Sequence, residues 1–168
     1  MWVLNKVADF FKLDDENWLK HSNPWSVYTR YSALPIIILA IWSREWVWNY
    51  SLIFILLSLL WTYYNPRFFS KPKSTKNWAS MAVFWERVYL NHKNIPISDH
   101  HINMLKIINS IMAIWLPFLV YGLWNLLFME TLLWALVVII WKTWFLDRMV
   151  WIYWEMKDNN KEYKSWDY

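Results

Sequence analysis

Two pairs of adjacent acidic and basic residues have the types needed for chemistry. Glu86 and Arg87 form one pair, and Asp147 and Arg148 form the other. Neighbours on a helix point about 100° apart, so the two members of a pair do not face each other. Each needs a partner from another segment if it is buried. A carboxylate and a guanidinium that meet in this way form either a catalytic site or a structural clasp.

The partners of these groups are expected on other segments. Asp147 needs a base, for which Arg30, Arg67 and Arg87 are the candidates, and Glu86 is a candidate partner for Arg148. Trp144 and Trp151 flank Arg148 at helical spacing, so its guanidinium is expected over an indole face. We predict no catalytic residue. The interpretation that we favour is a structural polar cluster at the inner membrane boundary: Arg30, Arg67, Glu86, Arg87, Asp147 and Arg148.

Histidines are the other chemically capable residues. His100 and His101 are adjacent and diverge on a helix, so they chelate poorly without help from His21 or a carboxylate. Capping or interfacial roles suit them better, and we predict no metal site and no cofactor other than bound lipid. The chain has no cysteine and one glycine, Gly122. Glycine-rich phosphate loops are therefore excluded, and so is close glycine-mediated packing of membrane helices.

The elements that position these groups are predicted to be membrane helices. Of the 168 residues, 58% are hydrophobic and 18% are charged, unlike a soluble domain. The apolar residues fall into runs long enough to cross a bilayer core of about 30 Å. The sequence predicts an all-α integral membrane protein, a single domain with four spans as two hairpins: 24–42, 46–64, 102–124 and 130–148.

The remaining segments are assigned to the membrane surface. Amphipathic spacing predicts interfacial helices at 2–13 and 76–91, and residues 157–168 form a polar tail that needs something to hold it. Arg44 is the one Lys or Arg in the short connections 43–45 and 125–130. The positive-inside rule therefore predicts a multi-pass protein with both termini on the inner, cytoplasmic side.

Tryptophans mark further contact points. Trp151 and Trp154 are expected in the inner aromatic belt, whereas Trp115 and Trp134 lie deeper than a belt requires. These four rings are predicted to pack helix to helix or to meet a partner protein. Lys142, above Arg148, is expected to extend toward the inner lipid headgroups.

Several stretches resemble a family of small, tryptophan-rich, four-helix membrane proteins of bacteria and archaea, a domain of unknown function. They are "HSNPWSVYTR" (21–30), "LPIIILAIWSREW" (34–46), "WTYYNPRFFSKPKSTKNWASMAVFWERVYLN" (61–91) and "WFLDRMVWIY" (144–153). The resemblance covers most of the chain and implies no activity. It also implies a glycine before Glu86, where this chain has Trp85.

The function predicted from these features is that of a non-catalytic accessory subunit in a larger membrane complex, such as a respiratory, photosynthetic or monooxygenase assembly. Its expected partners are membrane lipids and other membrane subunits, not nucleic acid. A membrane enzyme using the carboxylate, arginine and histidine residues at the inner boundary is the alternative. A transporter or channel ranks below both, because the span centres have few polar groups.

Overall fold

The computed structural model describes residues 15–90 and 95–168, and it contains helices and no strand within those residues. The all-helical prediction is confirmed. The interfacial helix predicted at 2–13 lies outside the described residues. Within them, three helical segments are long and apolar enough to cross a membrane: Pro24–Arg67, Asp99–Trp124 and Phe128–Met156.

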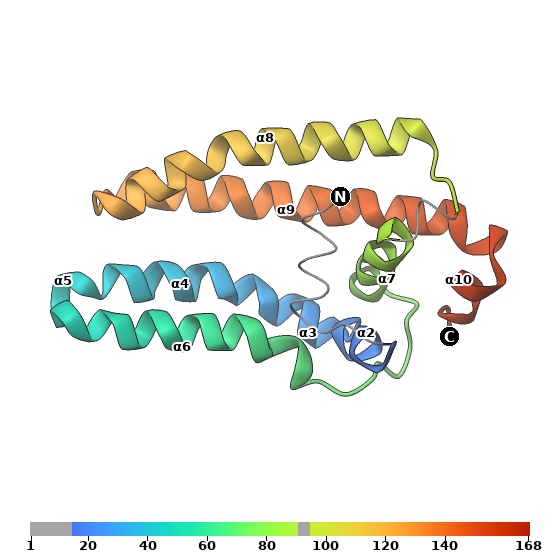
Figure 1. The fold of residues 1–168 in the computed structure, drawn as a ribbon, viewed down its shortest axis with the longest axis horizontal. Helices are drawn as coiled ribbons and strands as arrows, with labels where there is room; N and C mark the ends of the chain where they lie inside the picture. Colours follow the sequence, from blue (N-terminus) through green and yellow to red (C-terminus); the bar gives the residue numbers. More distant parts are fainter. Residues whose placement is uncertain (1–14, 91–94) are drawn as a thin grey trace.

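The segment Pro24–Arg67 is a series of short helices that folds back on itself. The chain reverses at Trp48, whose φ of 48° is unusual for a residue with a side chain. This turn comes later than the predicted one at 43–45. As a result α4 and α6 lie side by side (Figure 1). The elements in order are α3 (Pro24–Thr29), η1 (Arg30–Ser32), α4 (Ala33–Trp42), α5 (Arg44–Val47), η2 (Trp48–Tyr50), α6 (Ser51–Tyr64) and η3 (Asn65–Arg67).

Two long helices, α8 (Asp99–Trp124) and α9 (Phe128–Met156), also lie side by side. They are in close contact at Gly122, where an added Cβ would lie 3.0 Å from the Thr131 nitrogen. Glycine therefore does mediate a close helix contact, contrary to our exclusion from composition. The low glycine content was a poor guide, because one glycine suffices when it stands at the crossing point.

At one end of the helices, on the side that the sequence predicts to face inward, the chain packs into a compact cap around α7 (Trp78–Leu90). We call this the inner cap; it also contains α2 (Asp15–His21), α3, the last turns of α9, η4 (Lys157–Asn159) and α10 (Lys161–Ser165). In Figure 1, α7 is enclosed between these elements. Phe84, Trp85 and Val88 are fully buried, and so are Ala79 and Ser80 on other faces of the helix.

The helix predicted at 76–91 corresponds to α7, and most of its side chains are buried within the cap. The periodic apolar residues Trp78, Met81 and Trp85 defined one face. Small and apolar residues on the remaining faces also meet neighbours, as in any helix that is apolar nearly all round.

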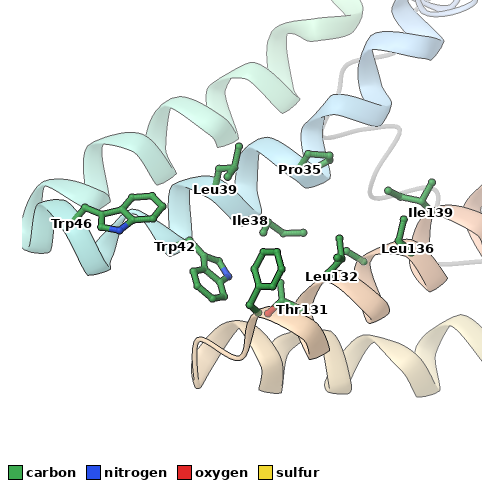
Figure 2. Close-up of a pocket in the computed structure, with 11 residues that line it drawn as sticks. Pro35, Ile38, Leu39, Trp42, Trp46, Thr131, Leu132, Leu136 and Ile139 are labelled. Atoms are coloured by element: carbon green, nitrogen blue, oxygen red, sulfur yellow. The ribbon is translucent and has the colours of Figure 1, made fainter.

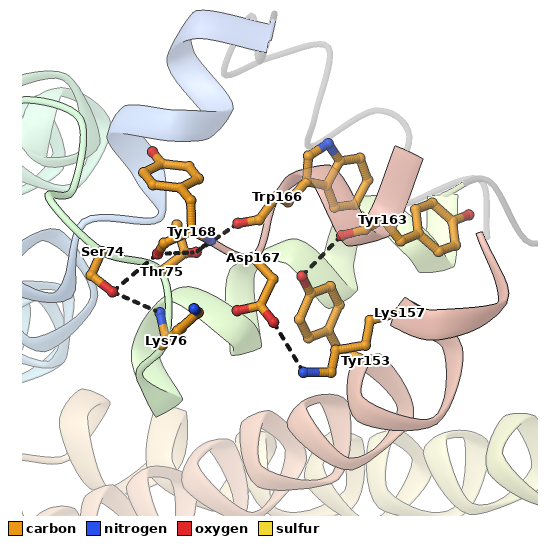
Figure 3. A network of polar contacts seen from close by, with 9 residues as sticks. All are labelled: Ser74, Thr75, Lys76, Tyr153, Lys157, Tyr163, Trp166, Asp167 and Tyr168. Atoms are coloured by element: carbon orange, nitrogen blue, oxygen red, sulfur yellow. Dashed lines mark hydrogen bonds and ion pairs between the residues drawn. The ribbon is translucent and has the colours of Figure 1, made fainter. Parts of the chain in front are cut away.

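The polar tail is held by the chain itself (Figure 3). The Thr75 hydroxyl donates to the Trp166 carbonyl at 2.6 Å and accepts from the Tyr168 amide at 2.9 Å. Tyr163 and Trp166 are buried against α7, and Lys157 pairs with Asp167 at 3.0 Å. The order of this segment consequently needs no partner protein.

Candidate functional site

The inner cap meets the membrane helices at a buried cluster of charged groups. His21 ends α2, Arg30 begins η1 and Glu86 comes from α7. The Nη1 group of Arg30 faces the Nε2 atom of His21, and its Nε donates to the Ser26 carbonyl at 3.2 Å. The Glu86 carboxylate lies 3.8 Å from the same His21 nitrogen. Side chains from η1 and from the sequence-distant helix α7 therefore converge on the imidazole at the end of α2.

The chain folds this way locally because Asn23 and Pro24 start a helix directly after His21. The Asn23 side chain accepts from the Trp25 amide at 2.9 Å and so caps the N-terminus of α3. The turn brings Arg30 back toward His21, and a second Arg30 nitrogen donates to the His21 carbonyl at 3.2 Å.

Burial and, to a smaller extent, the positive charge of Arg30 lower the pKa of His21 to about 4, although Glu86 opposes both effects. At neutral pH the ring is uncharged and its Nε2 lone pair can accept from Arg30. Burial alone would raise the pKa of Glu86, but contact with His21 and the charges of Arg30 and Lys142 hold that pKa below its usual value. Glu86 is therefore an anion among cations.

Lys142 brings a second positive charge to the membrane side of this cluster. Its ammonium lies 5.2 Å from the centre of the Tyr31 ring, and the Tyr31 hydroxyl is 3.1 Å from that of Thr143. Arg30, Tyr31 and Lys142 line one end of a cavity of about 230 Å³ between α4 and α9. Its other walls are aliphatic: Ala33, Leu34, Ile37, Val138 and Ile139.

A second cavity of about 470 Å³ lies between the same two helices and is almost entirely apolar. In Figure 2, Ile38 and Trp42 of α4 face Leu132 and Leu136 of α9 across it. Ile139 lines both cavities, so they meet at this residue. We call the two together the α4–α9 crevice. It is apolar along its length and carries Arg30 and Lys142 at its inner end.

The second acid–base pair meets different partners from those expected. The Asp147 carboxylate accepts from the Trp78 indole at 3.2 Å, not from an arginine. The guanidinium of Arg148 lies over the Trp151 ring at 5.6 Å, as its spacing predicted. Asp147 and Arg148 belong to the cap, where they fix α9 against α7 and against its own next turn.

The other predicted arginines are dispersed. Arg67 lies over the Tyr63 ring at 4.3 Å and donates to the Tyr63 carbonyl at 2.9 Å. Arg87 lies over Trp166 at 4.5 Å and its Nη2 is 3.7 Å from Glu162. Among the described residues, the six side chains predicted as one cluster are distributed over several contacts, and Arg30 and Glu86 share the site at His21.

The histidines considered as metal ligands lie apart. His21 belongs to the buried cluster, whereas the His101 ring is 2.8 Å from Glu155 on the exposed side of the cap. His100 stands beside His101 with ring centres 5.4 Å apart. Among the residues that the structure describes, no three His, Asp or Glu side chains are grouped closely enough to hold a metal.

The four predicted contact tryptophans also separate into two kinds. Trp115 and Trp134 stack on each other across α8 and α9, with ring centres 5.0 Å apart and planes at 16°. Trp151 and Trp154 are more than half exposed, and each lies under a cation, Arg148 or Lys157. The deep pair therefore packs helix to helix.

Comparison with known proteins identifies the family. A family of unknown function, DUF6653, matches residues 3–165. The chain belongs to DUF6653. The resemblance inferred from the sequence is confirmed, and no curated protein or solved structure gives a significant match.

Sequence reasoning missed several residues that shape the site in this DUF6653 member. Lys142 was assigned to the headgroups without its neighbour Tyr31, and Trp78 was read only as an apolar helix position. Arg44 was noted as an outer charge, yet it donates to the Leu123 carbonyl at 2.7 Å and also to that of Trp124. The sequence contained an indication of this contact, because a single cation in a short connection interacts favourably with the carbonyl end of a neighbouring helix.

Proposed function

We propose that the protein is a four-span membrane protein, arranged as two hairpins with both termini inside, which acts as a non-catalytic accessory subunit of a larger membrane complex. The reversal at Trp48 supports the span count, because it turns the 44-residue segment Pro24–Arg67 back on itself. One pass through α3 and α4 and a second through α6 then precede the passes of α8 and α9.

The observation that carries the non-catalytic reading is the environment of the carboxylates. Glu86 lies against a neutral histidine and an arginine, and Asp147 accepts from an indole. Neither His21 nor Glu86 lines the crevice. A general acid or base has to reach a substrate proton within hydrogen-bond distance. Glu86 is therefore held within the cap, and Asp147, which lines a separate hollow beside Trp78, has its carboxylate engaged by that indole.

The accessory role is supported by the surface of α6. Its main helical neighbour is α4, and its apolar side chains are exposed on the remaining faces. The exposed residues include Leu52, Ile53, Leu56, Leu57 and Leu60. Lipid or the helices of other subunits are the partners for such a surface. The ordered tail and the Trp115–Trp134 stack no longer support a partner, since both are satisfied within the chain.

The topology is tested with single cysteines, because the chain has none of its own. Ser165→Cys and Asn125→Cys place thiols on exposed residues of the tail and of the connection between α8 and α9. On intact cells a membrane-impermeant maleimide should label the Asn125 variant alone. Labelling of Ser165→Cys, or of both, contradicts the inner location of the tail.

The accessory role is tested by purification in mild detergent followed by native mass spectrometry. Co-purifying membrane subunits at fixed stoichiometry are expected, whereas a lone monodisperse monomer contradicts the proposal. The substitution Asp147→Asn distinguishes the accessory role from the enzyme alternative. A correctly assembled variant that has lost a measurable activity would favour catalysis. The proposal predicts that this substitution alters stability only.

A further inference from the structure

We propose that the α4–α9 crevice binds one anionic phospholipid of the inner leaflet, with its phosphate between Arg30 and Lys142 and an acyl chain along α9. The inference deepens the proposed function and rests on its inner-side assignment of the cap. It concerns a defined site, unlike the general annulus of lipid around any membrane protein.

The charged end of the crevice is suited to a phosphate. Lys142 makes no hydrogen bond or ion pair with the residues that the structure describes, so its ammonium donors remain available. Arg30 uses its Nε and one N–H on each terminal nitrogen toward Ser26 and His21. A guanidinium has five N–H donors, so one remains on each terminal nitrogen. Paired donors of this kind match phosphate oxygens.

The nearby acid does not cancel this charge. Glu86 belongs to the same cluster, but it contacts His21 on the cap side and does not line the cavity. His21 is neutral because burial and Arg30 depress its pKa to about 4. The groups facing the cavity at neutral pH are therefore two cations and the Tyr31 ring. An anion at this point gains attraction in a region of low dielectric constant.

The apolar part of the crevice has the length of an acyl chain. The ten residues from Lys142 back to Leu132 span about 15 Å of helix, which is half of a bilayer core of about 30 Å and so the depth of one leaflet. Cavity walls over this distance are aliphatic or aromatic. The larger cavity, about 470 Å³, falls within the range of small-molecule sites, about 300–1,000 Å³.

The experiment measures lipid retention by native mass spectrometry. The purified full-length protein is titrated with phosphatidylglycerol or with phosphatidylcholine of the same acyl chains. We expect one tightly held phosphatidylglycerol and a preference for it of about tenfold, which corresponds to about 1.4 kcal/mol. Equal retention of the two lipids overturns the headgroup assignment.

Two matched variants distinguish lipid binding at this site from attraction of the lipid by the net charge of the protein. Lys142→Gln should remove most of the preference for phosphatidylglycerol. Lys106→Gln removes the same charge from an exposed position of α8 outside the crevice, and should leave the preference unchanged. Equal loss in both variants would show that net charge alone attracts the lipid, and would overturn the proposal.

A second pair tests the acyl chain. Leu136 lines the crevice and is 50% exposed, whereas Leu133 is 54% exposed and does not line it. Leu136→Trp should weaken retention of both lipids at least several-fold, and Leu133→Trp should not. Equal retention by the two variants places the lipid elsewhere and contradicts the site.

The result of the lipid experiment can be distinguished from the results that test the proposed function. Lipid retention is measured on the isolated chain, so the absence of partner subunits leaves it intact. If the cysteine labelling instead places the tail outside, a preference for phosphatidylglycerol that depends on Lys142 would still establish the site and correct only the leaflet. Loss of the preference with the topology intact would overturn the lipid site alone.

Discussion

The inner cap and the parts of the membrane-length helices that lie beyond it, here called the outer half, differ in which side chains they bury. In the cap, aromatic residues such as Phe84, Trp85 and Tyr153 are almost completely buried, and backbone groups of the tail are hydrogen-bonded to Thr75. In the apolar windows of the three membrane-length segments, between 11% and 17% of residues are buried. The cap resembles a small water-soluble domain, whereas the outer helices expose their apolar side chains.

The difference shows what each half uses for stability. Water drives burial of apolar surface in the cap, at roughly 25 cal/mol per Å². Lipid offers no such driving force to the outer helices, so close packing and hydrogen bonds must hold them. The contacts there include the approach at Gly122, the Trp115–Trp134 stack and the Arg44 bonds to α8 carbonyls. Damage in the cap should therefore cost more than damage outside it.

The largest effect is expected at Trp85, the largest side chain that is fully buried in the cap. Trp85→Ala should lower the free energy of unfolding by about 3–5 kcal/mol, because it opens a cavity that the surrounding helices cannot fill. Unfolding by SDS titration in mild detergent measures it. Trp154→Ala is the matched control, because that ring is 54% exposed and should cost far less.

Trp85→Phe sharpens the test. The Trp85 indole nitrogen is buried without a hydrogen-bond partner among the described residues. A phenyl ring retains much of the volume and removes that polar group, so the loss should be smaller than with alanine. Equal losses for Trp85→Ala and Trp154→Ala would show that the cap is not the stabilising core.

The second effect is a dependence of stability on pH that originates at His21. The pKa of this buried ring is lowered from 6.5 to about 4 by burial and by Arg30. The unfolded chain therefore takes up a proton at His21 before the folded protein does. Stability is complete above pH 6.5 and decreases as the pH falls to about 4, by about 3 kcal/mol from this group.

The other charged groups at this site do not reverse the dependence of stability on pH, although Glu86 favours the protonated ring. Arg30 and Lys142 repel the protonated ring, and Glu86, whose pKa is also lowered, loses its stabilising charge at acid pH. Melting temperatures between pH 7 and 4 should fall, and His21→Gln should make the curve shallower. A His21→Gln curve as steep as the wild type would assign the acid sensitivity elsewhere.

Sequence patterns predicted those features that depend on neighbours within one helix. The span predicted from residue 24 starts where α3 starts, at Pro24, and the three-residue spacing of Arg148 and Trp151 predicted their contact. Runs of apolar residues gave the membrane-length helices. Each of these depends on local geometry, which the helical repeat determines.

Contacts between segments were predicted poorly, for a physical reason. Asp147 was matched to arginines because charge is visible in a sequence, yet an indole N–H from α7 is its donor. Partner choice depends on which helix faces lie together, and the burial of α7 on all sides was not anticipated. The first turn was predicted at 43–45, but the chain reverses at Trp48, which has a positive φ. A sequence pattern does not indicate such a turn at a tryptophan, because positive φ is typical of glycine.

The third effect belongs to the outer half and tests its dependence on close packing. Gly122→Ala should cost about 1–3 kcal/mol, because the new methyl group meets the Thr131 nitrogen and hydroxyl at 3.0 and 3.1 Å. The Thr131 amide cannot easily yield, since it donates to the Leu127 carbonyl at 2.9 Å. SDS titration measures the loss, and the near-ultraviolet circular dichroism of the Trp115–Trp134 stack should change with it.

Ala113→Val is the control for Gly122→Ala, because it adds bulk at an exposed position of the same helix. It should leave both the stability and the circular dichroism close to those of the wild type. If Gly122→Ala is equally silent, the two helices are not held by close approach, and the outer half depends on lipid alone.

The smallest effect concerns the tail, and it tests whether the cap reaches as far as residue 168. Thr75→Val keeps the side-chain shape but removes the hydroxyl that joins the Trp166 carbonyl and the Tyr168 amide. Each buried group left without its partner costs about 1–3 kcal/mol. The Thr75 amide and the Ser74 hydroxyl still donate to the Tyr168 carbonyl, at 2.9 and 3.0 Å, and keep the segment partly in place, so the net loss should be about 1–2 kcal/mol. Hydrogen exchange across residues 161–168 should accelerate.

Ser165→Ala removes an exposed hydroxyl bonded within the tail to Glu162, and should change exchange much less. Equal acceleration in the two variants would mean that the tail holds its own shape and only rests against the cap.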